Sequence, residues 1–411
     1  MSEFTKNLKE TIEKKHGEAH ELFKEGGKFE KLYPLFEAQD TFLLTPPDTT
    51  KGPTHVRDAV DLKRVMFTVV VALLPCLLWG IFNAGYQYYH YSGVEAGPIA
   101  YMLRGSWIVM PIVLTSYIVG GLWEVLFAVV RKHEINEGFL VTGLLFPLTL
   151  PPTIALWEVA VGISFGVVVG KEVFGGTGFN ILNPALTARA YLFFAHAKDM
   201  TGEIWAKSID GATGATPLGM GAAFGGEGKN VVDALADRGH TFFSMFGGLE
   251  PGSIGETAAI PILLGAAILI VSGVGSWRVM SGGCLGLLGA GILMNFMPTQ
   301  GMEDGEMVQL TTWTQVPALY HFVMGSFLFG IVFMATDPVS AANTNMGKWI
   351  YGALIGVVTV LVRVTNPGFP EGVMLAILFM NVMAPILDHY VVQAHIKNRN
   401  AKLRKFSYAK G

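Results

Sequence analysis

The sequence predicts an all-α protein that crosses a membrane many times. Of its 411 residues, 51% are hydrophobic and only 15% are charged, and the mean hydropathy is +0.44. A soluble domain of this size would need more charge to cover its surface. Apolar stretches also recur along the chain, at lengths close to the roughly twenty residues that span a bilayer as a helix. We therefore expect a polytopic protein embedded in the lipid bilayer.

Composition also argues against several other classes of protein. The formal net charge of -3 gives no reason to expect a nucleic-acid partner. Cys76 and Cys284 both lie within apolar runs, so we interpret them as buried small hydrophobes and not as a disulfide or a thiolate metal site. His133, His321 and His389 lack the spacing of metal ligands, so no metal cluster is expected.

Residues 1–64 form the first predicted unit, a cytoplasmic segment. They carry eleven Lys and Arg residues, many acids, and scattered aromatic residues such as Phe23, Tyr33 and Phe42, without the continuous apolar core of a signal peptide. This mixture is typical of a short, partly helical domain that rests on the membrane or on a partner subunit. A solvated tail is the alternative, although such tails usually carry fewer aromatic residues.

About ten apolar stretches follow, which we interpret as transmembrane helices. They lie at residues 65–82, 107–130, 138–150, 157–173, 185–197, 257–275, 279–297, 316–335, 347–364 and 372–392. Some are doubtful as full spans, because Pro147 and Pro151 interrupt the third and the stretch after Pro184 is too short to cross alone. Such helices persist at membrane depth only where protein or a water-filled cavity satisfies the freed backbone groups.

The distribution of Lys and Arg predicts the orientation in the membrane. With the N-terminus inside, the inner loops receive Arg131, Lys132, Lys171, Arg278 and Lys348, and the basic tail at 393–411 is also inside. The loop at 198–256, with eight acids and four bases, falls outside. The positive-inside rule thus favours cytoplasmic positions for both termini.

A weak internal repeat divides the predicted membrane region into two halves, 65–197 and 257–392. Residues 142–152 in the third span echo residues 329–338 in the eighth, an offset of five spans, so the halves would run in opposite senses across the membrane. Two inverted five-helix repeats are typical of a transporter or channel core with its pathway at the repeat interface. Chance similarity between Gly-rich and Pro-rich apolar segments is the alternative.

Three carboxylates lie within the predicted spans or at their edges. Glu124 is in the middle of the second span, Asp337 lies beside Pro338, and Asp388 ends the last span. Each could offer oxygen ligands to Na+ or relay a proton. The alternatives are a structural ion pair with Lys or Arg of another helix, or a simple interfacial position.

Two polar, Gly-containing segments could hold a planar ligand. Residues 175–184 lack the Lys of a nucleotide-binding loop, but their amides and the helix start at Ala185 could bind a polar, planar molecule between helices. Near the connection at 132–139, the pair Gly120 and Gly121 would let a flat quinone ring approach the backbone. A tight structural turn and a glycine pair for helix packing are the respective alternatives.

The segment 210–218 contains small residues and two hydroxyl groups, at Thr213 and Thr216. No His or Cys lies nearby in the sequence to activate either hydroxyl as a nucleophile. If one of them reacts, the activating groups must come from another protein.

This same segment resembles a flavinylation motif, Asp-Gly-x-Ser/Thr-Gly-Ala-Thr, in which the last threonine carries FMN. Further segments of the same family occur at residues 171–178, 183–185, 334–340 and 371–378. Together they closely resemble the B subunits of the Na+-translocating NADH:quinone oxidoreductases, over essentially the whole chain. The D subunit of the Rnf complex is a relative, but it lacks a charged extension like residues 1–64.

The resemblance implies a covalent FMN joined to Thr216 by a phosphoester. Asp210, Gly214 and Ala215 belong to the same motif, and a separate flavin transferase would install the cofactor from outside the membrane. The small residues of the motif would keep the hydroxyl accessible to the transferase. The transferase would then supply the activating groups that the segment itself lacks.

The resemblance also implies a non-covalent riboflavin and a quinone site. We expect riboflavin near Asn180 and Asn183. The positions that match the quinone site of the family are Gly120 and Gly121, with Glu137 and Phe139 as neighbours.

The function implied by the resemblance is that of a redox-driven Na+ pump component in a bacterial inner membrane, with a fold like that of urea transporters. Electrons from other subunits would reach ubiquinone through FMN and riboflavin, while Na+ would pass Glu124 and Asp337, with Asp388 as a further candidate. One alternative is an Rnf-type, ferredoxin-linked subunit. The other is a channel or transporter without a redox role.

Overall fold

The computed structural model describes most of the membrane region and parts of the two ends of the chain. The described residues are 21–23, 27–29, 33–43, 52, 60–132, 135, 137–200, 202, 205, 214–297, 300–303, 306–309, 312–366 and 370–408. Regular structure within them is helical, apart from a two-stranded antiparallel hairpin of β1 (Gln300–Glu303) and β2 (Glu306–Gln309). The predicted all-α class therefore holds for the membrane region, and the hairpin is an addition that the sequence did not predict.

Five helices in the described part of the chain are long and apolar enough to cross a membrane. They are α3 (Leu62–Tyr91), α4 (Pro98–Arg131), α13 (Trp277–Asn295), α16 (Asn345–Thr365) and α17 (Val373–Tyr408). Large apolar side chains such as Trp107, Leu122 and Leu285 are exposed on them, as expected for surfaces that face lipid. A multi-pass membrane protein, as predicted, is thus confirmed.

The remaining predicted spans are shorter or broken, so ten full crossings are not confirmed. They correspond to α5 (Gly138–Leu148), α6 (Leu156–Val168), α7 (Pro184–Ala195), α12 (Ala259–Val271) and, within 316–335, α14 (Tyr320–Val323), α15 (Phe327–Phe329) and the π-helical η4 (Gly330–Met334). Gly325 separates α14 from α15, and its φ of +72° is a left-handed conformation that glycine adopts without strain. A single predicted helix is thereby replaced by three short ones.

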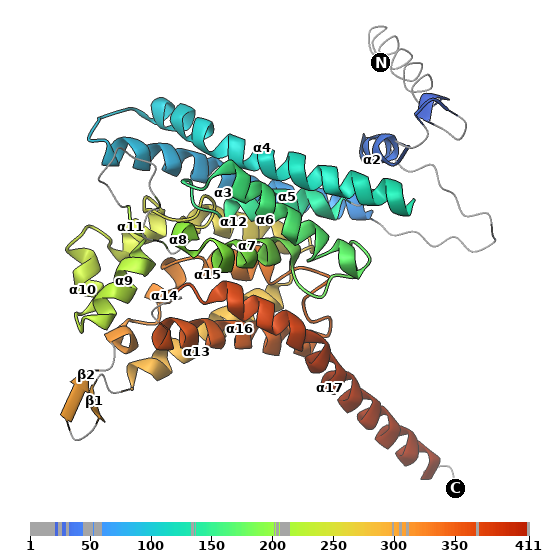
Figure 1. Ribbon diagram of the computed structural model, residues 1–411. Helices are drawn as coiled ribbons and strands as arrows, with labels where there is room; N and C mark the ends of the chain where they lie inside the picture. Colours follow the sequence, from blue (N-terminus) through green and yellow to red (C-terminus); the bar gives the residue numbers. More distant parts are fainter. Residues whose placement is uncertain are drawn as a thin grey trace.

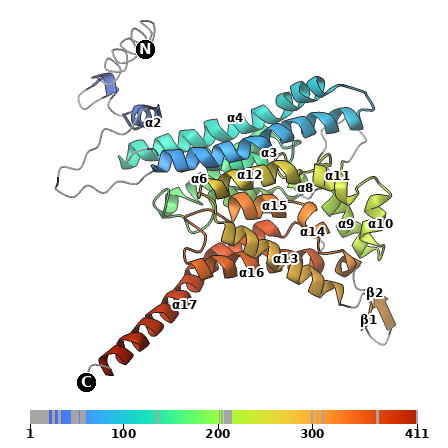
Figure 2. The same ribbon diagram turned by 180° about the vertical axis from the view of Figure 1, so that it is seen from behind.

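The smaller elements lie mostly in the connections. They are α2 (Tyr33–Leu43), η2 (Glu172–Phe174), α8 (Ala197–Met200), α9 (Pro217–Gly226), α10 (Val231–Ala236), α11 (Phe242–Gly247) and η3 (Thr312–Gln315). In both views, α2, the start of α3 and the C-terminal half of α17 lie at one end of the molecule (Figures 1 and 2). Helices α9 and α10 and the hairpin lie at the opposite end, so the two sets of polar elements are separated by the apolar helices.

The helices pack in two groups that meet in the middle of the molecule. In the first, α4 packs against α3, α5 and α6, and α6 packs against α7; in the second, α16 packs against both α13 and α17. Helix α12 packs against α3 of the first group and also contacts η4, which in turn contacts α13 and α17 of the second group. Helix α7 of the first group contacts α17 directly, so the two groups are joined at both places. The short helices α5, α7 and α15 therefore lie inside, where neighbouring protein surrounds their ends (Figure 1).

Glycines let α13 and α16 approach each other closely. A Cβ built on Gly286 would lie 2.0 Å from the carbonyl oxygen of Ala353, and one on Gly356 would lie 2.3 Å from that of Gly283. Such distances are far below van der Waals contact, so the two backbones touch directly. Because lipid is as apolar as the side chains, close packing of small residues is a main source of attraction between membrane helices.

We predict that Gly286→Ala destabilises the protein by about 1–3 kcal/mol, because the added methyl group must push α16 away. The measurement is thermal unfolding of the purified protein in detergent. Gly289→Ala on the same helix is the matched control, since a Cβ there meets nothing within 4 Å. Equal melting temperatures for the two variants would contradict this account of the packing.

Candidate functional site

Thr216 lies at the start of helix α9, at the end of the molecule that also holds α10 and the hairpin (Figure 1). It is the N-cap residue, and its Oγ accepts a hydrogen bond of 3.1 Å from the backbone N–H of Gly219. Its own N–H donates to the carbonyl oxygen of Gly202 at 2.9 Å. Pro217 follows at the first helical position, where its lack of an N–H is tolerated.

Two glycines keep the space around the Thr216 hydroxyl open. A Cβ on Gly202 would lie 3.0 Å from Thr216 Oγ, and one on Gly219 would lie 3.3 Å from it. Gly214 is buried and has a φ of +47°, and Ala215 is half-buried beside it. Asp210 lies outside the described residues. A group attached to the hydroxyl would therefore extend past Gly202 and Gly219, and a larger side chain at either position would narrow this space.

A cavity opens beside Thr216. Apolar and aromatic side chains form much of its wall, among them Phe193, Trp205, Leu218 and Met245. Aromatic walls suit a flat ring system. The residues present thus fit a flavin attached at Thr216, in both the open approach to the hydroxyl and the nature of the adjoining cavity.

Buried charges lie directly behind this cavity. Glu256 and Glu371 line it, and Arg189 of α7, with 1% of its surface exposed, lies between them. Arg189 Nη2 is 2.5 Å from Glu371 Oε2 and 3.8 Å from Glu256 Oε2. Arg363 of α16, fully buried, donates from Nη1 to the carbonyl oxygen of His321 at 2.7 Å. These charges join α7 of the first helix group to α16 of the second.

The sequence analysis missed this charge cluster, although a signal was present. Arg189 and Arg363 both lie within predicted membrane spans, where an ionisable residue is costly and indicates a functional or structural partner. The sequence analysis considered only the carboxylates in or near the predicted spans, and it therefore missed these two arginines. The acidic partners of Arg189, Glu256 and Glu371, lie in loops far away in the sequence, so this pairing could not be predicted.

A second cavity lies between the two helix groups. It brings together Asn180, Asn183 and Asp337, which the sequence analysis had proposed separately, and adds Lys171 and Thr177. Asn180 donates to the carbonyl oxygen of Leu182 at 3.0 Å. The cavity is therefore lined by several polar side chains within an otherwise apolar region.

Asn183 holds the start of α7. Its Oδ1 accepts from the N–H groups of Ala185 and Leu186 at 3.0 and 3.3 Å, and its Nδ2 donates to the carbonyl oxygen of Met334 at 3.4 Å. It therefore caps one interrupted helix and bonds the end of another, η4. Much of its hydrogen-bonding capacity is used by the protein itself.

The three proposed carboxylates have different surroundings. Glu124 is buried and forms an ion pair with Lys171, which also contacts Thr177 Oγ at 3.3 Å. Asp337 accepts hydrogen bonds from the N–H groups of Val339 and Ser340 at 3.4 and 3.3 Å. Asp337 is half-buried and lines the second cavity, whereas Glu124 lies behind Lys171 of the cavity wall.

Asp388, in contrast, braces the beginning of α16. Its carboxylate accepts from the N–H groups of Asn343 and Thr344 at 2.7 and 2.9 Å, and from the Thr344 hydroxyl. Thr344 is the N-cap residue of α16. These contacts favour a bracing role for Asp388.

The residues proposed for the quinone site lie close together at the junction of α4 and α5. The ring of Phe139 packs directly on Gly120, where an added Cβ would lie 2.5 Å from two ring carbons. A Cβ added on Gly121 would lie 3.8 Å from the same ring. Glu137 is the N-cap residue of α5, and its Oε1 lies 2.8 Å from Lys63 Nζ at the start of α3. The predicted proximity is therefore present, with Phe139 filling the space beside the glycines.

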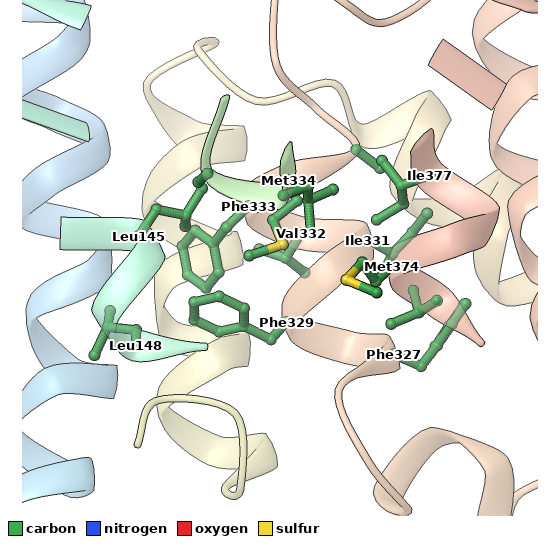
Figure 3. Close-up of a cluster of buried hydrophobic side chains, with 14 of the residues drawn as sticks. Leu145, Leu148, Phe327, Phe329, Ile331, Val332, Phe333, Met334, Met374 and Ile377 are labelled. Carbon is green, nitrogen blue, oxygen red and sulfur yellow. The ribbon is translucent and has the colours of Figure 1, made fainter. Parts of the chain in front are cut away.

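An apolar cluster separates the two cavities. The rings of Phe329 and Phe333 lie 5.0 Å apart between centroids and face Leu145 and Leu148 of α5 (Figure 3). Gly325 and Ser326 line the Thr216 cavity, whereas the segment 333–339 contributes to the second cavity. The chain thus runs from one cavity to the other through this cluster, whose labelled side chains are all at most 4% exposed.

The NQR2, RnfD, RnfE family matches residues 49–397 of the chain, a range that includes Thr216 and both cavities. The B subunit of the Na(+)-translocating NADH-quinone reductase of Stutzerimonas stutzeri is 49% identical over 403 residues, covering 92% of this chain and 96% of the relative. The corresponding protein of Klebsiella pneumoniae is 46% identical over 424 residues, covering 96% of this chain and 99% of the relative. The chain therefore belongs to the NQR2, RnfD, RnfE family.

Proposed function

We propose that the chain is the membrane subunit of a bacterial Na+-translocating NADH–quinone reductase that carries FMN on Thr216, binds riboflavin, passes electrons to ubiquinone and conducts Na+ across the inner membrane. The observation that carries the proposal is the position of Thr216, at a helix N-terminus and beside a cavity with aromatic walls. The relatives named as B subunits of this reductase, similar along nearly the whole chain, support the same conclusion.

The start of α9 suits a phosphoester on Thr216. The N-terminus of a helix carries partial positive charge and free N–H groups, and it stabilises a nearby anion by about 0.3–1 kcal/mol. Trp205 and Phe193 would flank the attached ring system in the cavity. A bound flavin would supply electron-transfer chemistry there, and a flavin transferase would act from the side of the membrane on which α9 and α10 lie.

Riboflavin and ubiquinone are assigned to the opposite side of the apolar cluster. In the second cavity, Asn180 and Thr177 are the better candidates for binding riboflavin, because Asn183 already caps α7. The quinone head group would enter beside Gly120 and Gly121, which requires the ring of Phe139 to move aside. Glu137, at the start of α5, would then lie near the entering ring.

For Na+, we propose a path between two inverted helix groups, through the second cavity and past Asp337. Packing of the second span against the fourth occurs in both halves, as α4 with α6 and as α13 with α16, which supports a structural repeat. Phe329, Phe333, Leu145 and Leu148 would form the barrier in this path, because they offer no oxygen ligands to an ion that has lost its water. The barrier would have to open for an ion to pass.

Two alternatives differ from this proposal in simple measurements. An Rnf-type protein would carry the same flavin in a complex that does not couple NADH oxidation to quinone reduction. A channel or transporter without a redox role would carry no flavin. The charged segment before α3 favours the quinone reductase over the Rnf-type protein.

We predict that Thr216→Ala abolishes covalent flavin, seen as complete loss of the fluorescent band on a denaturing gel under ultraviolet light. Thr216→Ser keeps the hydroxyl and should retain the band. Thr257→Ala is the matched control, because Thr257 lines the same cavity outside the motif. A band that persists in Thr216→Ala would exclude this residue as the attachment site.

We also predict that Glu124→Gln raises the Na+ concentration for half-maximal quinone reduction about tenfold, equivalent to about 1.4 kcal/mol. The substitution removes one of the two carboxylates beside Lys171, the other being Glu172 at 3.4 Å, so the wall of the second cavity becomes more positive and repels Na+ more strongly. The measurement is a Na+ titration of NADH-dependent quinone reduction in the purified complex.

The double variant Glu124→Gln, Lys171→Met distinguishes two roles for Glu124. If Glu124 acts only by neutralising Lys171, the double variant should regain the wild-type Na+ dependence. If it behaves like the single variant, Glu124 contacts the ion itself. An unchanged titration in Glu124→Gln would remove this residue from the pathway altogether.

A further inference from the structure

The wall of the Thr216 cavity contains two carboxyl groups that have no role in attaching a cofactor. Glu256 lies in the loop before α12 and is 6% exposed, and Glu371 lies in the turn before α17. Both contribute to the same cavity as Thr216. Any charge that enters this cavity therefore lies close to these two carboxyl groups.

Two buried arginines behind the cavity wall offset the negative charge of the two carboxyl groups. Arg189 Nη2 lies 2.5 Å from Glu371 Oε2 and 3.8 Å from Glu256 Oε2. Arg363 Nε donates to the backbone carbonyl oxygen of Glu371 at 3.4 Å. With both carboxyl groups ionised, the four side chains sum to zero charge; with one of them protonated, the sum is +1.

Glu256 is the member of the cluster that changes charge near neutral pH. Burial, opposed by the nearby Arg189 and reinforced by the charge of Glu371, raises its pKa to about 8. The nearby hydroxyl of Ser253 favours its ionised form. Among the described residues, other titratable groups near the cavity include Glu250, which pairs with His240, and the buried His321.

We propose that Glu256 sets the charge of the Thr216 cavity and thereby controls how readily the cavity accepts an added electron. The inference rests on the proposed function, in which NADH supplies the electron and a flavin on Thr216 receives it. With Glu256 protonated, the cluster is net positive and stabilises the added negative charge. With Glu256 ionised, electron entry is accompanied by uptake of one proton from solvent onto its carboxylate, and no other bond forms or breaks.

The direct test is the midpoint potential of the Thr216 flavin as a function of pH, measured in the complete complex. In the wild type, the potential should fall more steeply between about pH 7 and pH 9 than in Glu256→Gln, which stays neutral. Glu250→Gln is the matched control, because it removes another carboxylate from the same cavity wall and should keep the wild-type slope. Equal slopes in the wild type and Glu256→Gln would overturn the inference.

Ser253→Ala provides a second variant that leaves the carboxyl group in place. Loss of the hydroxyl that favours the ionised form should move the steep part of the curve to higher pH. A curve that does not move, or that moves to lower pH, would contradict the role given to Glu256. The variant also guards against misfolding of Glu256→Gln as the cause of a changed slope.

Thermal unfolding tests the titration of Glu256 without reference to flavin. Because its pKa is raised from 4.5 to about 8 in the folded protein, the folded state binds the proton more tightly. The contribution of this group to stability is therefore fully present below about pH 4.5 and is lost as the pH rises through about 8. Glu256→Gln should lack this loss, and an identical loss in both proteins would exclude titration of Glu256.

The flavin measurements and the unfolding measurements distinguish a failure of the proposed function from a failure of the inference about Glu256. Absence of a fluorescent flavin band would refute the proposed function, while the unfolding curves would still test the titrating carboxyl group. A flavin band with equal potential slopes would refute the inference alone.

Discussion

Interrupted helices at membrane depth impose the main constraint on this structure. Each interruption leaves backbone N–H and C=O groups without helical partners, and lipid offers no replacement. Asn183 resolves two interruptions at once, because it caps α7 and donates to the carbonyl oxygen of Met334 at the end of η4. The short helices must therefore lie in the interior, next to each other, and the long helices α3, α4, α13, α16 and α17 surround them.

This arrangement explains why both cavities lie where they do. The broken segment between Gly325 and Asp337 crosses the middle of the molecule, and its polar ends line one cavity each. Its apolar centre packs on α5 through Phe329 and Phe333 (Figure 3). Polar groups freed by the breaks thus lie on either side of a dry centre, which is the arrangement that an ion path with a closed barrier needs.

The sequence predicted the membrane class, the approximate positions of the apolar segments and the meeting of Gly120 with Phe139. It could not predict that the segment 316–335 breaks at Gly325, because a glycine in an apolar run can either stay within a helix or end it. The ion pair of Glu124 with Lys171 joins positions 47 residues apart, and no local pattern encodes it. Pairing of this kind follows from packing alone, and packing depends on the whole fold.

The buried cluster around Arg189 is costly as a purely structural device. Apolar residues of similar volume often give equal or greater stability than a buried ion pair, because desolvation of both charges offsets their attraction. A role in packing alone therefore explains poorly why four ionisable side chains lie in or behind the wall of one cavity. A cavity that receives negative charge needs fixed positive charge nearby, and carboxyl groups are needed in turn to keep two arginines in place before that charge arrives. The observed composition, two arginines and two carboxyl groups, meets both needs.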